Sequence, residues 1–396
     1  MQPLTLREGE SLDAGTLPPR VLDALTTAGV VSAELEGGGW VVKAGTKVGV
    51  VNMAGQQIVI QPKVGINRIV FMMSYARRPK FWRDDLVWLD PEADLVEALA
   101  HAFVAQTHRA LKQGVLKGYV TVEESLPVLR GRIREGDQLR RRFGRSIPLE
   151  VRYDDYSVDI AENQILLLAV ERLLKLPGLR RRHRAGLHRL RRQLVDVTLL
   201  AKGSEVPSWA PSRLNTRYQP ALVLAELILS GHSFEQRVGD VVMSGYLLNM
   251  AKIFEDFVTV ALADAFKPFG GVSKLQYVTF LDEEKGIEVR PDLVWFRGGS
   301  PGAVVDAKYK AEKPSGFPNA DFYQLLAYCT VLGLDRGHLV YAEGNEEART
   351  HHVLHATTRL TAHTLDLQKN PDLILEDVAA LAERLAKDAA GESQSA

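Results

Sequence analysis

The stretch from Ile287 to Tyr328 begins IEVRPDLVWF, turns at RGGSPG, continues AVVDAKYK and ends in DFYQLLAY. Two β-branched, apolar runs flank the Gly/Pro turn, which predicts a β-hairpin. Each run carries one carboxylate where a buried strand should be apolar: Asp292 and Asp306. Lys308 follows two residues after Asp306, so both side chains are expected on one strand face. Burying two acids and a lysine is costly unless a metal ion or substrate compensates them, so the hairpin is predicted to be a nuclease centre.

Length and composition set the class of protein. A chain of 396 residues predicts two or three domains, and 46% apolar with 25% charged residues is typical of soluble globular proteins. The single cysteine, Cys329, excludes a disulfide framework and a cysteine-rich zinc site, and it fits a reducing cytoplasm. The sequence contains no signal pattern and no run of ~20 apolar residues. We therefore expect a cytoplasmic protein with no membrane partner.

The chain is expected to divide into three folded segments and a tail. Residues 1–63 read as a β-rich unit with a short helix over 17–28, and residues 64–200 mix helices with strands. Residues 201–390 contain the hairpin, further strands at 336–343 and 349–358, and a final helix that starts at Pro371. Residues 391–396 are expected to be disordered. The fold class is thus α+β or α/β, with several domains.

Two helices are expected to place polar side chains beside the hairpin. The run from Met243 to Phe266 is amphipathic, and Glu255 lies in its apolar centre, which favours an active-site role over a surface ion pair. A second helix over 319–333 carries Gln324 and Tyr328, which share one helix face because they are four residues apart.

The middle of the chain is locally basic although the whole chain has a net charge of zero. Between Arg130 and Arg192 there are 17 Lys and Arg against 8 Asp and Glu, in the runs RGRIREGDQLRRRFGR and LRRRHRAGLHRLRRQ. Such runs form either a solvated helix face or a surface that contacts phosphates. Charge alone leaves both interpretations open.

In chain order, the polar set is Glu255 on a helix, Asp292 and Asp306-Ala307-Lys308 on a hairpin, and Gln324-x-x-x-Tyr328 on a helix. This order resembles the PD-(D/E)xK nucleases in the branch that adds a QxxxY helix. The bare D…DxK pattern is weak, whereas the full ordered set is much more specific. The resemblance implies a restriction-endonuclease-like C-terminal domain, with a mixed sheet flanked by helices.

A wider resemblance covers roughly residues 62–343. The blocks GINRIVFMMSYA, VLRGRIRE, YDDYSVDIAENQILLLAV, VVDAKYK and DFYQLLAYC resemble the McrC family, the nuclease subunit of McrBC modification-dependent restriction systems. The resemblance implies an endonuclease acting on double-stranded, modified DNA with a separate McrB-like AAA+ GTPase ring, whose nucleotide hydrolysis it stimulates. Contacts with that ring would lie within about residues 1–200. The chain has no Walker-type loop of its own, which fits this division of labour.

With that resemblance, each residue of the polar set receives an expected role. Asp292 and Asp306 are expected to bind Mg²⁺ directly, with Mn²⁺ as an alternative, and Glu255 directly or through water. Lys308 would orient or help deprotonate the attacking water, while Gln324 and Tyr328 would position DNA or the helix. The three acids at 282–284 are expected to be solvated. Two alternatives remain: a stand-alone QxxxY repair nuclease, and a non-cutting adaptor that activates the AAA+ partner.

Overall fold

The computed structural model describes residues 4–13, 19–36, 39–53, 56–77, 79, 95–143, 145–176, 179–201, 203–238, 241–309, 318–342 and 349–390. The chain folds into two compact units, and the first is built from both ends of the sequence. Unit 1 contains residues 1–96 and 231–396, and unit 2 contains residues 97–230. This division differs from the predicted boundaries at 63 and 200. The predicted disordered tail at 391–396 lies outside the described residues.

The first sheet of unit 1 joins strands that are far apart in sequence. Its order is β1-β6-β5-β11-β10, with β5 antiparallel to both β6 and β11. Next to it in sequence lie a small sheet of order β2-β4-β3 and two helices, α1 and α2. The bounds are β1 Leu4–Arg7, β2 Ser11–Asp13, α1 Pro19–Thr27, β3 Val31–Glu36, β4 Gly39–Ala44, β5 Lys47–Met53, β6 Gln56–Gln61, α2 Ile66–Arg77, β10 His232–Val238 and β11 Val241–Asn249.

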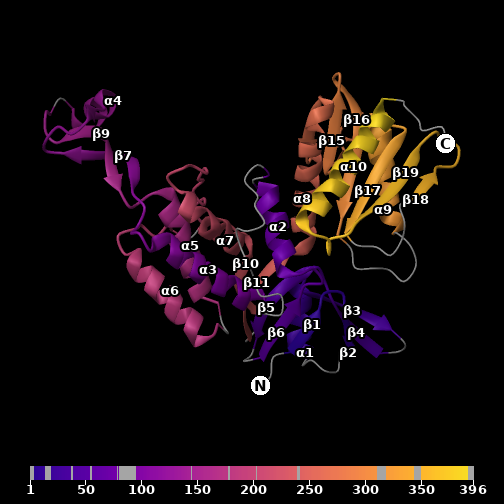
Figure 1. Cartoon of the computed structure of the whole chain (residues 1–396), viewed down its shortest axis with the longest axis horizontal. Helices are drawn as coiled ribbons and strands as arrows, with labels where there is room; N and C mark the ends of the chain where they lie inside the picture. The colour runs from indigo at the N-terminus through magenta and orange to yellow at the C-terminus, as the bar shows by residue number, and fades with distance from the viewer. Residues whose placement is uncertain are drawn as a thin grey trace. The chain divides into compact units, whose positions relative to one another are not determined.

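The second large sheet of unit 1 is mixed and six-stranded. Its order is β12-β15-β16-β17-β19-β18, and only the pairs β16–β17 and β17–β19 are parallel. Helices α8, α9 and α10 contact its strands (Figure 1). The bounds are α8 Met250–Ala265, β12 Val272–Leu275, β13 Thr279–Phe280, β14 Glu288–Val289, β15 Leu293–Arg297, β16 Ser300–Lys308, α9 Asn319–Leu332, β17 Arg336–Ala342, β18 Arg349–His352, β19 Arg359–Leu365 and α10 Pro371–Ala389.

The helices of this sheet bury opposite strand faces. Leu325 and Cys329 of α9 form one apolar core with Val304 of β16 and Leu339 of β17. Trp295 of β15 stacks at 4.7 Å on Phe266, which follows α8. Because strand side chains alternate, Val304, Asp306 and Lys308 share one face, which is the face that α9 covers.

Helix α2 connects the N-terminal region to α8 within unit 1. Its apolar residues lie all round the helix, and Phe71 and Tyr75 contact Phe257 at centroid distances of 5.0 and 5.8 Å. Most of the apolar residues of this helix are therefore buried. A second contact ties the N-terminus to the hairpin: Tyr309, the residue after Lys308, donates a hydrogen bond to the buried carboxylate of Glu8 at 2.9 Å.

Unit 2 contains helices and one small sheet of order β7-β9-β8. Helix α5 packs against α6 and α7, and α4 packs against strand β9 of the sheet (Figure 1). The bounds are α3 Leu95–Leu111, β7 Gly118–Leu126, β8 Arg132–Ile133, α4 Glu135–Arg142, β9 Leu149–Ser157, α5 Ala161–Leu174, α6 Arg181–Gln193, η3 Thr216–Tyr218 and α7 Gln219–Ser230.

Two details of the predicted elements are wrong. The helix predicted from Met243 begins at Met250, because residues 241–249 form β11 between β5 and β10. Asn249 caps the helix by accepting hydrogen bonds from the backbone N–H groups of Ala251 and Lys252. The strand predicted over 349–358 ends at His352, and β19, which was not predicted, follows it. The final helix does start at Pro371, as predicted.

Among the helices that the structure describes, none is long and apolar enough to cross a bilayer.

Candidate active site

Strands β15 and β16 bring the two acids of the hairpin together. Leu293 lies opposite Val305 in the antiparallel register, so Asp292 and Asp306 are neighbours at the same end of the pair. Their exposed fractions are only 8% and 2%. The Oδ2 atom of Asp292 accepts a hydrogen bond from the backbone N–H of Ala307 at 2.9 Å, which fixes this carboxyl against the neighbouring strand.

Lys308 extends the site along the same strand face. Its Nζ atom lies 2.5 Å from Oδ2 of Asp306 and donates a hydrogen bond to Oε1 of Gln324 at 2.9 Å. Asp306 is buried, whereas Lys308 is half-buried and Gln324 is exposed. The site therefore opens to solvent on the side of Lys308 and Gln324.

Helix α9 continues this hydrogen-bonded chain. The amide of Gln324 donates to the hydroxyl of Tyr328 at 2.7 Å, one helical turn further on. That hydroxyl donates in turn to the backbone oxygen of Arg290 at 3.3 Å, two residues before Asp292. The QxxxY pair thus links Lys308 on β16 to the backbone that leads into Asp292.

Glu255 of α8 reaches the site through another residue. The Nε2 atom of Gln276 donates to Oε1 of Glu255 at 2.8 Å and to Oδ1 of Asp292 at 2.9 Å. Glu255 also forms an ion pair with Lys252 at 2.8 Å. In the described part of the chain, no three His, Cys, Asp or Glu side chains are grouped closely enough to hold a metal ion.

Sequence reasoning did not identify Gln276. This residue follows β12 and has a φ of 49°, in the left-handed region that costs a non-glycine residue about 1 kcal/mol or more. Its backbone N–H donates to the carbonyl oxygen of Asp292 at 2.8 Å, and its side chain bridges Asp292 and Glu255. The backbone conformation and the two bridging bonds together indicate a residue that positions the site.

Asp321, at the start of α9, is a second residue of the site that was not predicted from the sequence. Its exposed fraction is 5%, and it accepts a hydrogen bond from the hydroxyl of Tyr341 at 2.9 Å. Its negative charge helps to raise the pKa of Asp306. By contrast, Asp282 accepts hydrogen bonds from Gly286 and Ile287 within its own exposed turn, as expected for a solvated acid.

Burial and like charge control the protonation of the two aspartates. Burial, and then the charge of Asp306, raise the pKa of Asp292 to about 7. Burial also raises the pKa of Asp306, against the opposing effect of Lys308. For Lys308, burial works to lower the pKa, but the charge of Asp306 outweighs it and the pKa is raised. The pair of acids is thus poised to hold or release a proton near neutral pH, beside a lysine that stays charged.

The donor set fits a divalent cation bound by two carboxylates. Oδ2 of Asp306 is buried and forms an ion pair with the Lys308 ammonium at 2.5 Å. Mg²⁺ is commonly held by one or two carboxylates together with waters. A cation here would offset the repulsion between the two acids, and Glu255, which shares the Gln276 amide with Asp292, would contribute directly or through a bound water.

The structure thus combines a mixed sheet with paired carboxylates at its strand ends, an adjacent lysine and a QxxxY helix. The sequence pattern of the family described as McrBC 5-methylcytosine restriction system component matches residues 42–342. The match covers most of the chain, and the chain belongs to this family. No curated protein matches it.

Solved structures add a likeness in fold. The chain is similar to a chain of the refined half-complex from a tetradecameric assembly of Thermococcus gammatolerans McrB AAA+ hexamers with bound McrC. The TM-score is 0.59 at 16% identity, covering 97% of this chain and 100% of the other. It also matches a chain of the Thermococcus gammatolerans McrBC complex with a TM-score of 0.38 at 18% identity, covering 67% of this chain and 88% of that one. The mixed α and β architecture is thus shared with the first of these structures.

Replacing Gln276 by Asn tests its positioning role. Asn tolerates the left-handed backbone but is one methylene shorter, so it should not bridge Glu255 and Asp292. Because the Gln276 hydrogen bond lowers the pKa of Asp292, the variant should titrate this carboxyl at a higher pH than the wild type does. Carboxyl NMR of Asp-labelled protein, with Asp292→Asn for assignment, measures the shift. An unchanged titration would contradict the role.

Proposed function

We propose that this chain is the DNA endonuclease subunit of a McrBC-like restriction complex. The single observation that carries the proposal is the buried pair Asp292 and Asp306, joined through Lys308 to the QxxxY helix. Membership of the McrBC family supports the same reading. In this proposal residues 250–389 form a PD-(D/E)xK nuclease core, and the substrate is double-stranded, modified DNA.

Mg²⁺ is the proposed cofactor, with Mn²⁺ as an alternative, held by Asp292 and Asp306. When bound, the cation supplies Lewis acidity and charge neutralisation at the scissile phosphate. Gln276 fixes Oδ1 of Asp292, and Ala307 fixes its Oδ2 atom. The protein therefore holds this carboxylate in place before substrate arrives.

Lys308 acts in this proposal as a cation and not as a base. Its pKa is raised by Asp306, so it remains an ammonium at neutral pH. Its three N–H donors are shared between Asp306, Gln324 and the open side of the site, where a water or a phosphate oxygen would bind. Attack by water forms a new P–O bond and breaks the bond to the leaving oxygen. The ammonium would stabilise the charge that develops, the proton of the water would pass to solvent on the open side of the site, and the leaving oxygen would take a proton from solvent.

The proposed partner is a McrB-like AAA+ GTPase ring whose hydrolysis this chain stimulates. The structural relative is an assembly of McrB hexamers with bound McrC, which supports this assignment. In unit 2, the β7-β9-β8 sheet and α4 expose large apolar side chains, as protein interaction surfaces do. We call these residues the apolar tip: Tyr119, Val128, Leu129, Leu139, Phe143, Ile147 and Tyr156.

The two alternatives are less well supported. A stand-alone repair nuclease would have no use for a McrBC-type chain that extends from residue 42. A non-cutting adaptor would have no use for the closely paired Asp292, Asp306 and Lys308, since two buried acids side by side destabilise a protein that does not use them.

The nuclease assignment determines which variants should lose cutting. Asp306→Asn and Lys308→Ala should each reduce Mg²⁺-dependent cleavage of methylated plasmid by at least about 100-fold. The first removes a carboxylate that would hold the cation, and the second removes the ammonium that would stabilise charge at the phosphate. Both should still stimulate the GTPase of the cognate partner. The control Glu283→Ala removes an exposed acid near the hairpin and should cut like the wild type. If Asp306→Asn still cuts, the site assignment fails; if the wild type stimulates but does not cut, the adaptor reading is correct.

The pH should determine how strongly Mg²⁺ stabilises the protein. An ordinary aspartate titrates near pH ~3.9, whereas the pKa of Asp292 is raised to about 7 in the fold. The associated stability is complete at low pH and is lost as pH rises through the raised value, because the folded pair must then hold two charges. The gain in Tm from Mg²⁺ over EDTA should therefore grow from about pH 6 to about pH 8. In Asp306→Ala the gain in Tm from Mg²⁺ should be small at both pH values. An equal gain in the wild type and the variant would rule out this metal site.

The apolar tip should be the surface that contacts the partner GTPase. The double variant Leu139→Ser, Phe143→Asn removes side chains that are 69% and 92% exposed, and Asn suits the left-handed backbone at position 143. It should reduce stimulation of the partner GTPase by at least about tenfold, as expected for the centre of an interface. The control Leu354→Asn changes an 84% exposed leucine in unit 1 and should have no effect. Full stimulation by the double variant would show that the apolar tip is not the contact.

A further inference from the structure

The two arginine runs of unit 2 look alike in sequence but differ in the structure. In the first run, at 130–145, arginines form ion pairs with acids of α4 and of the neighbouring strands β7 and β9. The pairs join Arg130 to Asp155, Arg134 to Glu123, Arg140 to Asp137, and both Arg141 and Arg142 to Glu150. Much of the positive charge of this run is therefore neutralised within the fold.

The second run forms α6, which carries six arginines and no acid. Its buried face consists of His183, Leu187 and Leu190. Arg184 and Arg191 are used internally, the first by carbonyl oxygens after α5 and the second by Glu171. Three others, Arg181, Arg189 and Arg192, are exposed, and their side chains form no ion pair or hydrogen bond with any residue that the structure describes. We call these three the free arginines of α6.

Helical geometry places the free arginines along one side of α6. Arg189 and Arg192 lie eight and eleven residues after Arg181, so all three side chains share the face opposite the buried leucines. At ~1.5 Å per residue, Arg181 and Arg192 are separated by ~16 Å along the axis. One DNA strand places a phosphate every ~3.4 Å along its helix axis, so the row is long enough to span about five phosphates.

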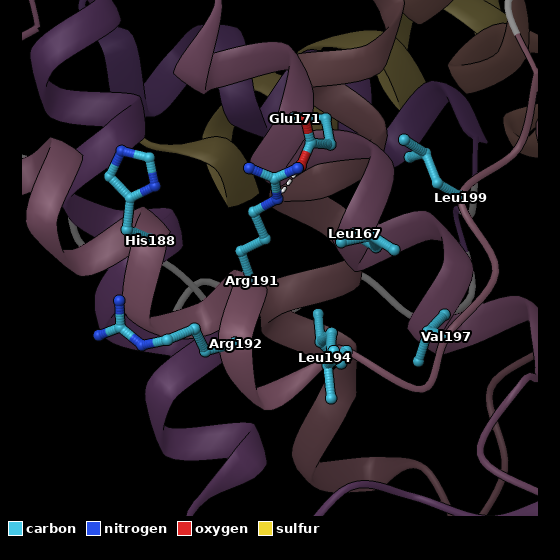
Figure 2. A pocket seen from close by; sticks show the side chains of 9 residues that line it. Leu167, Glu171, His188, Arg191, Arg192, Leu194, Val197 and Leu199 are labelled. Carbon is cyan, nitrogen blue, oxygen red and sulfur yellow. Dashed lines mark ion pairs between the residues drawn. The ribbon is translucent and has the colours of Figure 1, made fainter.

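The surrounding contacts hold α6 in a fixed orientation. A Cβ on Gly186 would come within 2.7 Å of Val104, so α6 packs closely on α3. His183 lies 2.6 Å from Glu97 of α3. At the other end, a cavity of about 450 Å³ lies beside His188, Arg191 and Arg192. Figure 2 shows Arg191 reaching back to Glu171, whereas Arg192 extends away from this pair.

The composition of the exposed face distinguishes DNA from protein as the occupant. None of the large apolar side chains that the structure describes as exposed belongs to α6, whereas several belong to the apolar tip. Protein interfaces have an apolar centre, and phosphate-binding surfaces do not need one. Arginine also matches phosphate better than lysine because its planar donors can bind two oxygens at once.

We propose that the free arginines of α6 bind the phosphate backbone of double-stranded DNA, without reading its sequence. The inference rests on the proposed function, because it takes DNA as the substrate. It assigns the two basic runs different roles: the run at 130–145 is structural, and α6 is the phosphate-binding surface.

The test is DNA binding by the full chain in EDTA, measured by fluorescence anisotropy with an unmodified duplex of about 30 base pairs at several salt concentrations. The triple variant Arg181→Gln, Arg189→Gln, Arg192→Gln should bind at least tenfold more weakly. Its slope of log affinity against log salt should be smaller by about 2 to 3, since each phosphate contact contributes ~0.9. The same three positions changed to Lys should retain most of the slope.

The matched control is Arg130→Gln, Arg140→Gln, Arg141→Gln, which removes the same charge from paired arginines of the same unit. Equal losses in both triple variants would overturn the inference, because net charge alone would then explain them. Unchanged DNA binding by the α6 variant would also overturn it, and a simultaneous loss of partner GTPase stimulation would identify α6 as a protein contact. Cleavage by Asp306→Asn tests the proposed function separately, since binding in EDTA requires no catalysis.

Discussion

The unfavourable proximity of two buried carboxylates is the constraint on which the rest of unit 1 depends. Asp292 and Asp306 are removed from water at the end of two apolar strands, and each resists ionisation. An isolated buried charge costs several kcal/mol, and a second like charge adds to that cost. The surrounding residues lower this cost in three ways: through the Lys308 ammonium, through the Ala307 N–H and through the Gln276 amide.

Ala307 and Lys308 belong to β16, Gln276 follows β12, and two helices support them, which explains why the site needs more than the hairpin. Lys308 is supported by Gln324 of α9, and Gln276 is shared with Glu255 of α8. The N-terminal region contributes as well, since Glu8 holds Tyr309 immediately after the lysine. A change in any of these elements alters the position or the charge of the same two carboxyls. The proposed chemistry therefore depends on packing across the full unit and not on the hairpin alone.

The sequence predicted the parts of the site that follow from local geometry. The strand period places Asp306 and Lys308 on one face, and the helix period does the same for Gln324 and Tyr328; both pairs are in contact. Residues whose role depends on distant chain segments were not predictable. Gln276 acquires its role from a left-handed backbone and from carboxyls 16 and 21 positions away. The prediction for residues 243–249 was wrong for a related reason. Their apolar pattern is compatible with a helix, and pairing with β5 and β10 makes them strand β11 instead.

The same limit applies to the basic runs, and there it has a functional consequence. Local charge counts treat the arginines at 130–145 and those of α6 as equivalent. The fold separates them, because β7 and β9 carry acids that face the first run, while α6 packs its apolar face on unit 2 and its free arginines meet no acid among the described residues. A charged surface can act on an external phosphate only if the fold has not already neutralised it. Only arginines that remain unpaired in the fold can bind an external phosphate. Which arginines these are depends on the topology and does not follow from the composition.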